Sequence, residues 1–108
     1  MTEQAMYILA SLARGECHGY GIARDAEELS GGRIRLTAGT LYGALGRLSD
    51  EGLVEPAGER DVQGRRRRYY RLTAAGELAL AEEVERLRST AAALGARLPS
   101  TRTAPGPA

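Results

Sequence analysis

The sequence of 108 residues contains no lysine, asparagine, phenylalanine or tryptophan, and its only cysteine is Cys17. One cysteine cannot form a disulfide within the chain or a thiolate metal cluster, so disulfide-stapled and cysteine-rich zinc folds are excluded. No run approaches the roughly 20 apolar residues that a membrane span needs, and the start of the chain lacks the basic and apolar regions of a signal peptide. These absences predict a cytoplasmic protein that does not contact a membrane.

The lack of lysine leaves arginine as the only basic residue type apart from one histidine, and the placement of arginine says more than the net charge of +1. Residues 60–71 hold six arginines and one aspartate, whereas residues 77–88 hold four glutamates and two arginines. A concentrated basic segment in a nearly neutral chain indicates an anionic polymer as partner. With 43% hydrophobic and 27% charged residues, the chain has the composition of one small globular unit.

Apolar residues recur at intervals of three and four, which predicts four helices. Threonines stand where three of them begin, and threonine is a good N-cap because its hydroxyl accepts a hydrogen bond from the first turn. Glycine or proline follows each apolar pattern and ends the helix. The predicted helices span residues 2–14, 18–29, 37–51 and 73–98.

Three segments predict strands. Residues 33–36 alternate polar and apolar side chains, which is typical of a short strand. Residues 53–55 and 68–72 are rich in strand-forming types, and the polar stretch 57–67 between them predicts a β-hairpin with a long tip. The predicted fold class is therefore mainly α with a small β-hairpin, followed by a disordered tail over residues 99–108.

The third predicted helix has two faces. Leu41, Leu45 and Leu48 form an apolar stripe, whereas three glycines lie opposite, each costing about 1 kcal/mol relative to alanine. Short side chains suit a helix that must approach the floor of the DNA major groove. The alternative explanation for these glycines is that they only reflect a glycine-rich proteome. The candidate DNA contacts on this helix are Thr37, Gly39, Thr40, Tyr42, Gly43 and Arg47.

Four consecutive arginines follow Gly64 in the predicted hairpin. Because alternate side chains of a strand face opposite ways, Arg66 and Arg68 share one face, and Arg65 and Arg67 share the other. A ribbon with outward-pointing arginines can straddle a phosphate backbone or enter the minor groove, and the alternative is a solvated loop. We predict that Arg65, Arg66 and Arg67 contact DNA.

Four short motifs occur in order along residues 18–76. They are His18-Gly19-Tyr20-Gly21-Ile22, residues 39–48 (GTLYGALGRL), Glu51-Gly52-Leu53-Val54 and residues 64–76 (GRRRRYYRLTAAG). Together they resemble the PadR family of transcriptional regulators. The resemblance implies a winged helix-turn-helix over residues 1–72, with residues 37–47 as the recognition helix and residues 65–67 as the wing. It also implies a dimerisation helix over residues 73–98. The multidrug-binding members that resemble this chain in size hold planar ligands between a pair of tryptophans, and this chain has no tryptophan, which argues against that mode of ligand binding.

The longest predicted helix carries an apolar seam spaced as in a coiled coil. At 1.5 Å per residue it would extend ~39 Å, further than a domain of this size can cover. Because apolar side chains left in water are unfavourable, we predict a homodimer whose two recognition helices meet major grooves about 34 Å apart on an inverted repeat. The seam residues are Leu80, Val84, Leu87, Ala91, Leu94 and Leu98.

Enzymatic and metal sites are not predicted. The adjacent Cys17 and His18 cannot form a tetrahedral metal site, and no motif places an acid to orient a nucleophile–base pair. Gly19 and Gly21 lack the preceding strand and the further glycine of a nucleotide-binding loop. Pairing of Cys17 between chains as a redox switch stays open.

The interpretation is a sequence-specific DNA-binding transcriptional repressor that acts as a homodimer, without a cofactor. We expect a small apolar or aromatic effector to bind between the first and the longest helix, with Tyr7 as the candidate contact. Two alternatives remain: a winged-helix module that binds another protein and not DNA, and a drug-binding protein.

Overall fold

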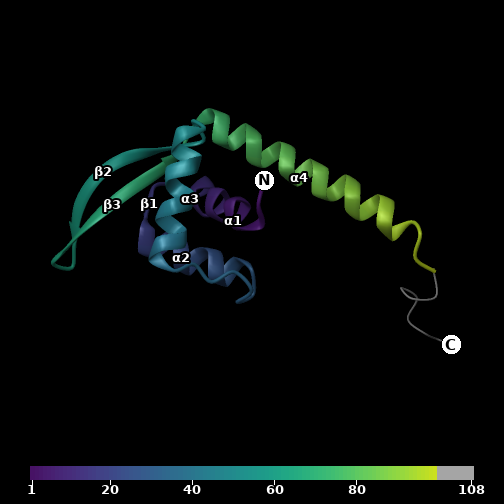
Figure 1. Cartoon of the computed structure of the whole chain (residues 1–108), viewed down its shortest axis with the longest axis horizontal. Coiled ribbons are helices and arrows are strands. Elements are labelled where there is room, and N and C mark those ends of the chain that lie inside the picture. Colours follow the sequence, from purple (N-terminus) through teal and green to yellow (C-terminus); the bar gives the residue numbers. More distant parts are fainter. Residues whose placement is uncertain (100–108) are drawn as a thin grey trace.

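The computed structural model describes residues 1–99, which form four helices and three strands (Figure 1). The strands make one antiparallel sheet in the order β1–β3–β2. The hairpin of β2 and β3 projects from one side of the helices, and α4 leaves them on the other. The elements are α1 (Glu3–Ala13), β1 (Cys17–His18), α2 (Gly19–Leu29), α3 (Ala38–Asp50), β2 (Val54–Val62), β3 (Arg65–Leu72) and α4 (Ala74–Gly95).

Side-chain caps begin each helix at the positions that the sequence predicts. Thr2, Thr37 and Thr73 each accept a hydrogen bond from the backbone N–H three residues later. His18 caps α2 in the same way, because its Nδ1 accepts from the N–H of Gly21 at 3.1 Å. These contacts satisfy backbone donors that the first helical turn leaves without a partner.

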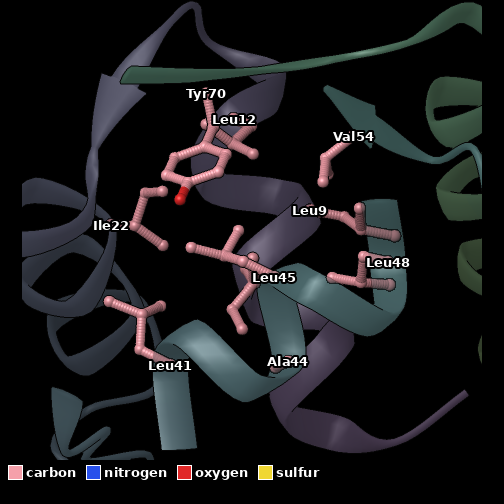
Figure 2. Packing of buried hydrophobic residues seen from close by; sticks show 10 residues of the cluster. Leu9, Leu12, Ile22, Leu41, Ala44, Leu45, Leu48, Val54 and Tyr70 are labelled. Carbon is pink, nitrogen blue, oxygen red and sulfur yellow. The ribbon is translucent and has the colours of Figure 1, made fainter. Parts of the chain in front are cut away.

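One apolar core joins α1, α2 and α3 to the sheet (Figure 2). Tyr70 of β3 is 7% exposed and lies among Leu12, Ile22 and Leu45. Burying one large apolar side chain stabilises the fold by about 1.5–3 kcal/mol. The leucine stripe of α3 is part of this core and holds the helix in place, while the opposite face of α3 stays exposed. The largest fully buried side chains are Ile8, Leu9, Ile22, Leu45 and Val54.

The first turn of α4 is anchored to the connection between α3 and β2. The hydroxyl of Thr73 donates to the carbonyl of Gly52 at 2.6 Å, and its backbone N–H donates to the carbonyl of Leu53 at 3.1 Å. A Cβ at Gly76 would overlap the same Leu53 carbonyl oxygen. Glycine is therefore required for α4 to leave the domain at this point.

The predicted strand over residues 33–36 is wrong. This segment is an irregular connection between α2 and α3, in which Ile34 is 7% exposed and its N–H donates to the hydroxyl of Ser30 at 2.8 Å. A strand needs a neighbour, and the open edge of β3 is occupied by β1, where Cys17 pairs with Tyr70. Polar and apolar side chains alternate in this segment because Ile34 is buried, whereas Arg33 and Arg35 on either side of it are exposed.

The long tip predicted for the hairpin is also wrong. β2 continues to Val62 and β3 begins at Arg65, so only Gln63 and Gly64 form the turn. The register shifts between Pro56 and Glu59, next to Gly58, whose φ is +93°. The strands pair over polar residues because both faces of the projecting ribbon are exposed, and so no apolar alternation marks them.

The long helix ends three residues earlier than predicted. α4 stops at Gly95, and the N–H groups of Arg97 and Leu98 bond to carbonyls only three residues back. Glycine has a low helix propensity, and Pro99 disfavours a helical conformation at the residue before it. Leu98 therefore lies beyond α4, and residues 100–108 of the predicted tail lie outside the described residues.

Candidate nucleic-acid interface

The exposed face of α3 is nearly free of side-chain bulk. A Cβ at Gly39 or Gly46 would meet no heavy atom within 4 Å, and one at Gly43 would meet only the guanidinium of Arg47, at 3.7 Å. Packing within the protomer therefore does not require these glycines. The polar side chains exposed on or next to this surface include those of Thr37, Thr40, Tyr42 and Arg47, together with the acidic Asp50.

Tyr42 is positioned by α2. A Cβ at Gly19 would overlap the Tyr42 hydroxyl and approach its Cζ to 2.9 Å, so only glycine lets this ring lie against the start of α2. The ring centroid of Tyr42 lies 6.5 Å from that of Tyr70, and the ring is 45% exposed. The two predicted motifs at residues 18–22 and 39–48 are thus in direct contact.

A cavity of about 530 Å³ lies between α3 and the hairpin. Its wall includes Tyr42 and Ser49 from α3, Pro56 from β2, and Arg68 and Tyr70 from β3. A hydrogen bond to Tyr70 holds the pKa of the Arg68 guanidinium above its ordinary value. Arg68 was not among the predicted contacts, because strand alternation does not say which face of the hairpin looks toward α3.

The three predicted wing arginines have different surroundings. Arg65 is exposed at the end of the hairpin. Arg66 is bound by two carboxylates, with its Nε 3.0 Å from Glu59 and its Nη1 3.6 Å from Asp61. Arg67 is half-buried, and its guanidinium lies 5.4 Å from the ring centroid of Tyr20. The Nε of Arg67 is buried without a hydrogen-bond partner among the described residues.

Positive charge without a nearby carboxylate gathers on α3 and β3. Of the fourteen arginines within residues 1–99, eight have a carboxylate oxygen within 4.0 Å. The six others include Arg47, Arg65, Arg67 and Arg68. Four of the six arginines without a carboxylate within 4.0 Å therefore lie on α3 and β3, although Asp50 and Glu59 also lie on this surface.

The outer face of the sheet is tied together by ion pairs and rings. Glu16 binds Arg60 and Arg71, and the hydrogen bond from Arg60 holds the pKa of the Glu16 carboxyl below its usual range. The Arg60 guanidinium lies 4.0 Å from the ring centroid of Tyr69, which meets His18 edge-on at 5.4 Å. These contacts fix β1, and with it the start of α2, against the hairpin.

The predicted dimerisation seam is exposed over most of α4. Val84, Leu87 and Leu94 are 39%, 43% and 65% exposed. Leu80 instead packs partly against the core of its own protomer, while Ala91 is exposed. The exposed row therefore runs from Val84 to Leu94.

Tyr7, the predicted effector contact, lies on α1 and accepts a hydrogen bond from Arg33 at 3.1 Å. Burial raises the pKa of the Cys17 thiol, which opposes thiolate formation. Within residues 1–99, no helix is both long and apolar enough to cross a membrane, and no three His, Cys, Asp or Glu side chains are grouped to hold a metal ion.

Residues 8–82 match the model of the transcriptional regulator PadR-like family. A transcriptional regulator of Mycobacterium tuberculosis is 42% identical over 78 residues, which cover 72% of this chain and 69% of that protein. An uncharacterised 37.1 kDa protein in a transposon of Streptomyces fradiae is 44% identical over 78 residues. That match covers 72% of this chain but only 21% of the transposon protein.

Solved structures show the same fold. A PadR family regulator of Clostridium difficile superposes with a TM-score of 0.74 at 26% identity, over 87% of this chain and 96% of that chain. Bacillus subtilis PadR in complex with operator DNA superposes with a TM-score of 0.67 at 26% identity, over 78% of this chain and 48% of that chain. The predicted winged helix-turn-helix with a long C-terminal helix is confirmed.

Proposed function

Because the chain belongs to the transcriptional regulator PadR-like family, we propose that it binds double-stranded DNA in a sequence-specific manner through α3 and the β2–β3 hairpin. In this proposal α3 enters the major groove, where its glycines allow the helix backbone to approach the base edges. Thr37, Thr40, Tyr42 and Arg47 contact bases and phosphates around it. The solved complex of Bacillus subtilis PadR with operator DNA supports double-stranded DNA as the partner by likeness of fold.

The observation that carries the proposal is the charge on α3 and β3. Arg47, Arg65, Arg67 and Arg68 have no carboxylate within 4.0 Å in residues 1–99, although most other arginines do. Phosphates can supply the missing counter-charges, and their condensed cations are then released into solution. Arg66 must exchange Glu59 and Asp61 for a phosphate, so we expect its contribution to be smaller than that of Arg65.

Salt dependence tests the assignment of the hairpin. Arg65→Ala should weaken binding to all duplexes and reduce the slope of log affinity against log salt by about one unit, because one phosphate contact is lost. Arg14→Ala is the matched control: it removes the same charge at the C-terminal cap of α1, outside this surface. Fluorescence anisotropy at several salt concentrations measures both. Equal slopes for the two variants would contradict the assignment.

The proposed functional unit is a homodimer on an inverted-repeat operator. The exposed row from Val84 to Leu94 on α4 supports it, because leaving these side chains in water is unfavourable. A two-fold axis along α4 would present one recognition helix to each half-site. The regulatory effect that we propose is repression, in which the dimer covers an operator that overlaps a promoter.

An effector is the second part of the proposal. A small apolar or aromatic molecule bound between α1 and α4, with Tyr7 as one contact, would change the distance between the two hairpins and so disfavour the DNA-bound state. The packing of α1 against α4 supports a coupling between ligand and dimer geometry. A thermal-melting screen of compounds tests this part alone, and a screen without any stabilising compound removes it. A chain that binds no duplex would instead favour a protein-binding or drug-binding role.

A further inference from the structure

Tyr20 places an exposed aromatic ring between the start of α2 and the hairpin. The residue is 56% exposed. The guanidinium of Arg67 from β3 lies 5.4 Å from the centroid of this ring, and the ring of His18 lies nearly parallel to it with 6.4 Å between the centroids. Arg24, one turn later on α2, lies 6.0 Å from the same centroid. The ring therefore contacts charged side chains rather than the apolar core.

Arg67 differs from the other arginines that lie over a tyrosine ring. Arg24 and Arg60 each have a glutamate oxygen within 4.0 Å in addition to the ring. Arg67 has no carboxylate oxygen within that distance in residues 1–99, and its buried Nε has no hydrogen-bond partner there. The contact with Tyr20 thus orders the guanidinium of Arg67 without neutralising it.

An ordered guanidinium without a counter-charge is suited to bind a phosphate. An arginine that binds a phosphate must give up the rotamer freedom of a long side chain. A ring that holds the guanidinium beforehand removes part of this entropic cost from the binding step. Because the ring has no net charge, the guanidinium keeps its own charge for the phosphate.

Tyr20 also lies next to the start of α3. It lines a cavity of about 370 Å³ together with Thr37, the N-cap of α3, and with Arg35 from the connection before it. The contact between Tyr20 and Arg67 therefore joins the two parts of the proposed interface, which are α3 and the hairpin.

We infer that Tyr20 is a positioning residue for DNA binding, because its ring holds the guanidinium of Arg67 where a phosphate of the duplex lies between α3 and the hairpin. This inference rests on the proposed DNA binding. It gives α2 a part in that binding that acts through Arg67 and not through a contact of Tyr20 with DNA. A cation–π contact at an exposed site corresponds to an affinity change of about two- to fivefold.

A double-mutant cycle measures the coupling between the ring and the guanidinium. The probe is a fluorescent duplex selected from a random library with the wild-type chain, and fluorescence anisotropy gives the affinity. Tyr20→Leu removes the ring but keeps an apolar side chain, and should weaken binding about threefold. Arg67→Ala should weaken binding more strongly, because a phosphate contact is lost. Tyr20→Leu added to Arg67→Ala should have no further effect.

Three matched variants assign the effect to the ring and to its partner. Tyr20→Phe keeps the ring without the hydroxyl and should bind as the wild type does. Tyr20→Trp supplies the ring that attracts a cation most strongly, and should bind at least as tightly. In an Arg65→Ala background, Tyr20→Leu should still cost about threefold, because Arg65 is exposed at the end of the hairpin. The melting temperatures should stay close to that of the wild type, because Tyr20 is exposed.

The outcomes distinguish this inference from the proposed function. An equal loss from Tyr20→Leu in the wild-type and Arg67→Ala backgrounds overturns the coupling, since the ring would then act independently of Arg67. Wild-type affinity for Tyr20→Leu overturns it too, and so does a Tyr20→Phe variant as weak as Tyr20→Leu, because the hydroxyl would then be the acting group. These results leave DNA binding intact. A wild-type chain that selects no duplex at all contradicts the proposed function itself.

Discussion

His18 has two structural roles at the start of α2. Its Nδ1 accepts the hydrogen bond from Gly21 that caps the helix, and its ring contacts Tyr69 of the hairpin. Burial, and then the charge of Arg67, hold the pKa of His18 below its ordinary value of 6.5. Both effects favour the neutral ring, which is the form that can accept this hydrogen bond. A single residue thus links the helix-turn-helix to the hairpin.

This link predicts a pH dependence of stability. Because the folded pKa of His18 lies below 6.5, the unfolded chain binds the proton more strongly, so the contribution is full above pH 6.5 and is lost as the pH falls toward the folded pKa. We expect the melting temperature to fall between pH 7.5 and 5.5. His18→Asn, whose side chain caps a helix without titrating, should flatten this dependence. Melting curves check it, and a variant with the same pH profile as the wild type would reject the role of His18.

At the scale of elements, α3 and α4 each have one apolar face that packs against the core and another face that stays exposed. α3 buries Leu41, Leu45 and Leu48 and leaves its glycine-bearing face open. α4 is attached over its first three turns, where Gly76, Leu80 and Glu83 pack against the domain, and then extends away from it with its apolar row exposed. The stability of α4 along its second half therefore depends on what covers that row.

The seam of α4 predicts the effect of a charge at its centre. In the proposed dimer, Leu87→Glu places a carboxylate in each half of the interface and removes two leucines that the partner helix would bury, a loss of roughly 3–6 kcal/mol. We expect monomers at micromolar concentration and at least 100-fold weaker operator binding. Leu78→Glu is the matched control, since Leu78 is 61% exposed and lies nine residues away, about 180° around the helix. Light scattering that shows a dimer for Leu87→Glu would reject the seam.

At the scale of the whole molecule, the β2–β3 hairpin and the exposed apolar row of α4 lie on opposite sides of the winged-helix domain. The hairpin projects on one side and α4 leaves on the other (Figure 1). A dimer formed through α4 therefore keeps α3 and the hairpin of both protomers accessible. In the proposed dimer, this separation would allow dimer geometry to control DNA binding without covering the proposed DNA-binding surface.

The proposed dimer predicts a strict spacing between half-sites. Two rigidly held recognition helices can enter successive major grooves only when the half-sites lie about 10 base pairs apart on one side of the duplex. Insertion of roughly five base pairs, half a helical turn, should reduce affinity to that of a single half-site. Insertion of a full turn should be less harmful, because both half-sites face the protein again. Gel-shift titration of the three duplexes checks this, and equal affinities would argue against a rigid two-fold complex.

The helix starts, the leucine stripe of α3 and the family were accessible from the chain alone. Caps such as Thr37 and Thr73 act within one turn, and apolar spacing of three and four is a local signal, so neither depends on the rest of the fold. The motifs from His18 to Gly76 also combine local features, namely caps, close-packed glycines and turns. Interactions between residues that are close in the sequence can therefore be predicted from the sequence alone.

Contacts between distant segments were not accessible in this way. Strand β1 exists because Cys17 and His18 reach the edge of β3, more than 50 residues later, whereas residues 33–36, which were predicted to form a strand, pair with no strand. The same holds for charge: four adjacent arginines look equivalent in the sequence, yet Glu59 and Asp61 bind Arg66, while Arg68 turns toward α3. Pairing and neutralisation depend on which partners folding brings near, and only the packed chain decides that.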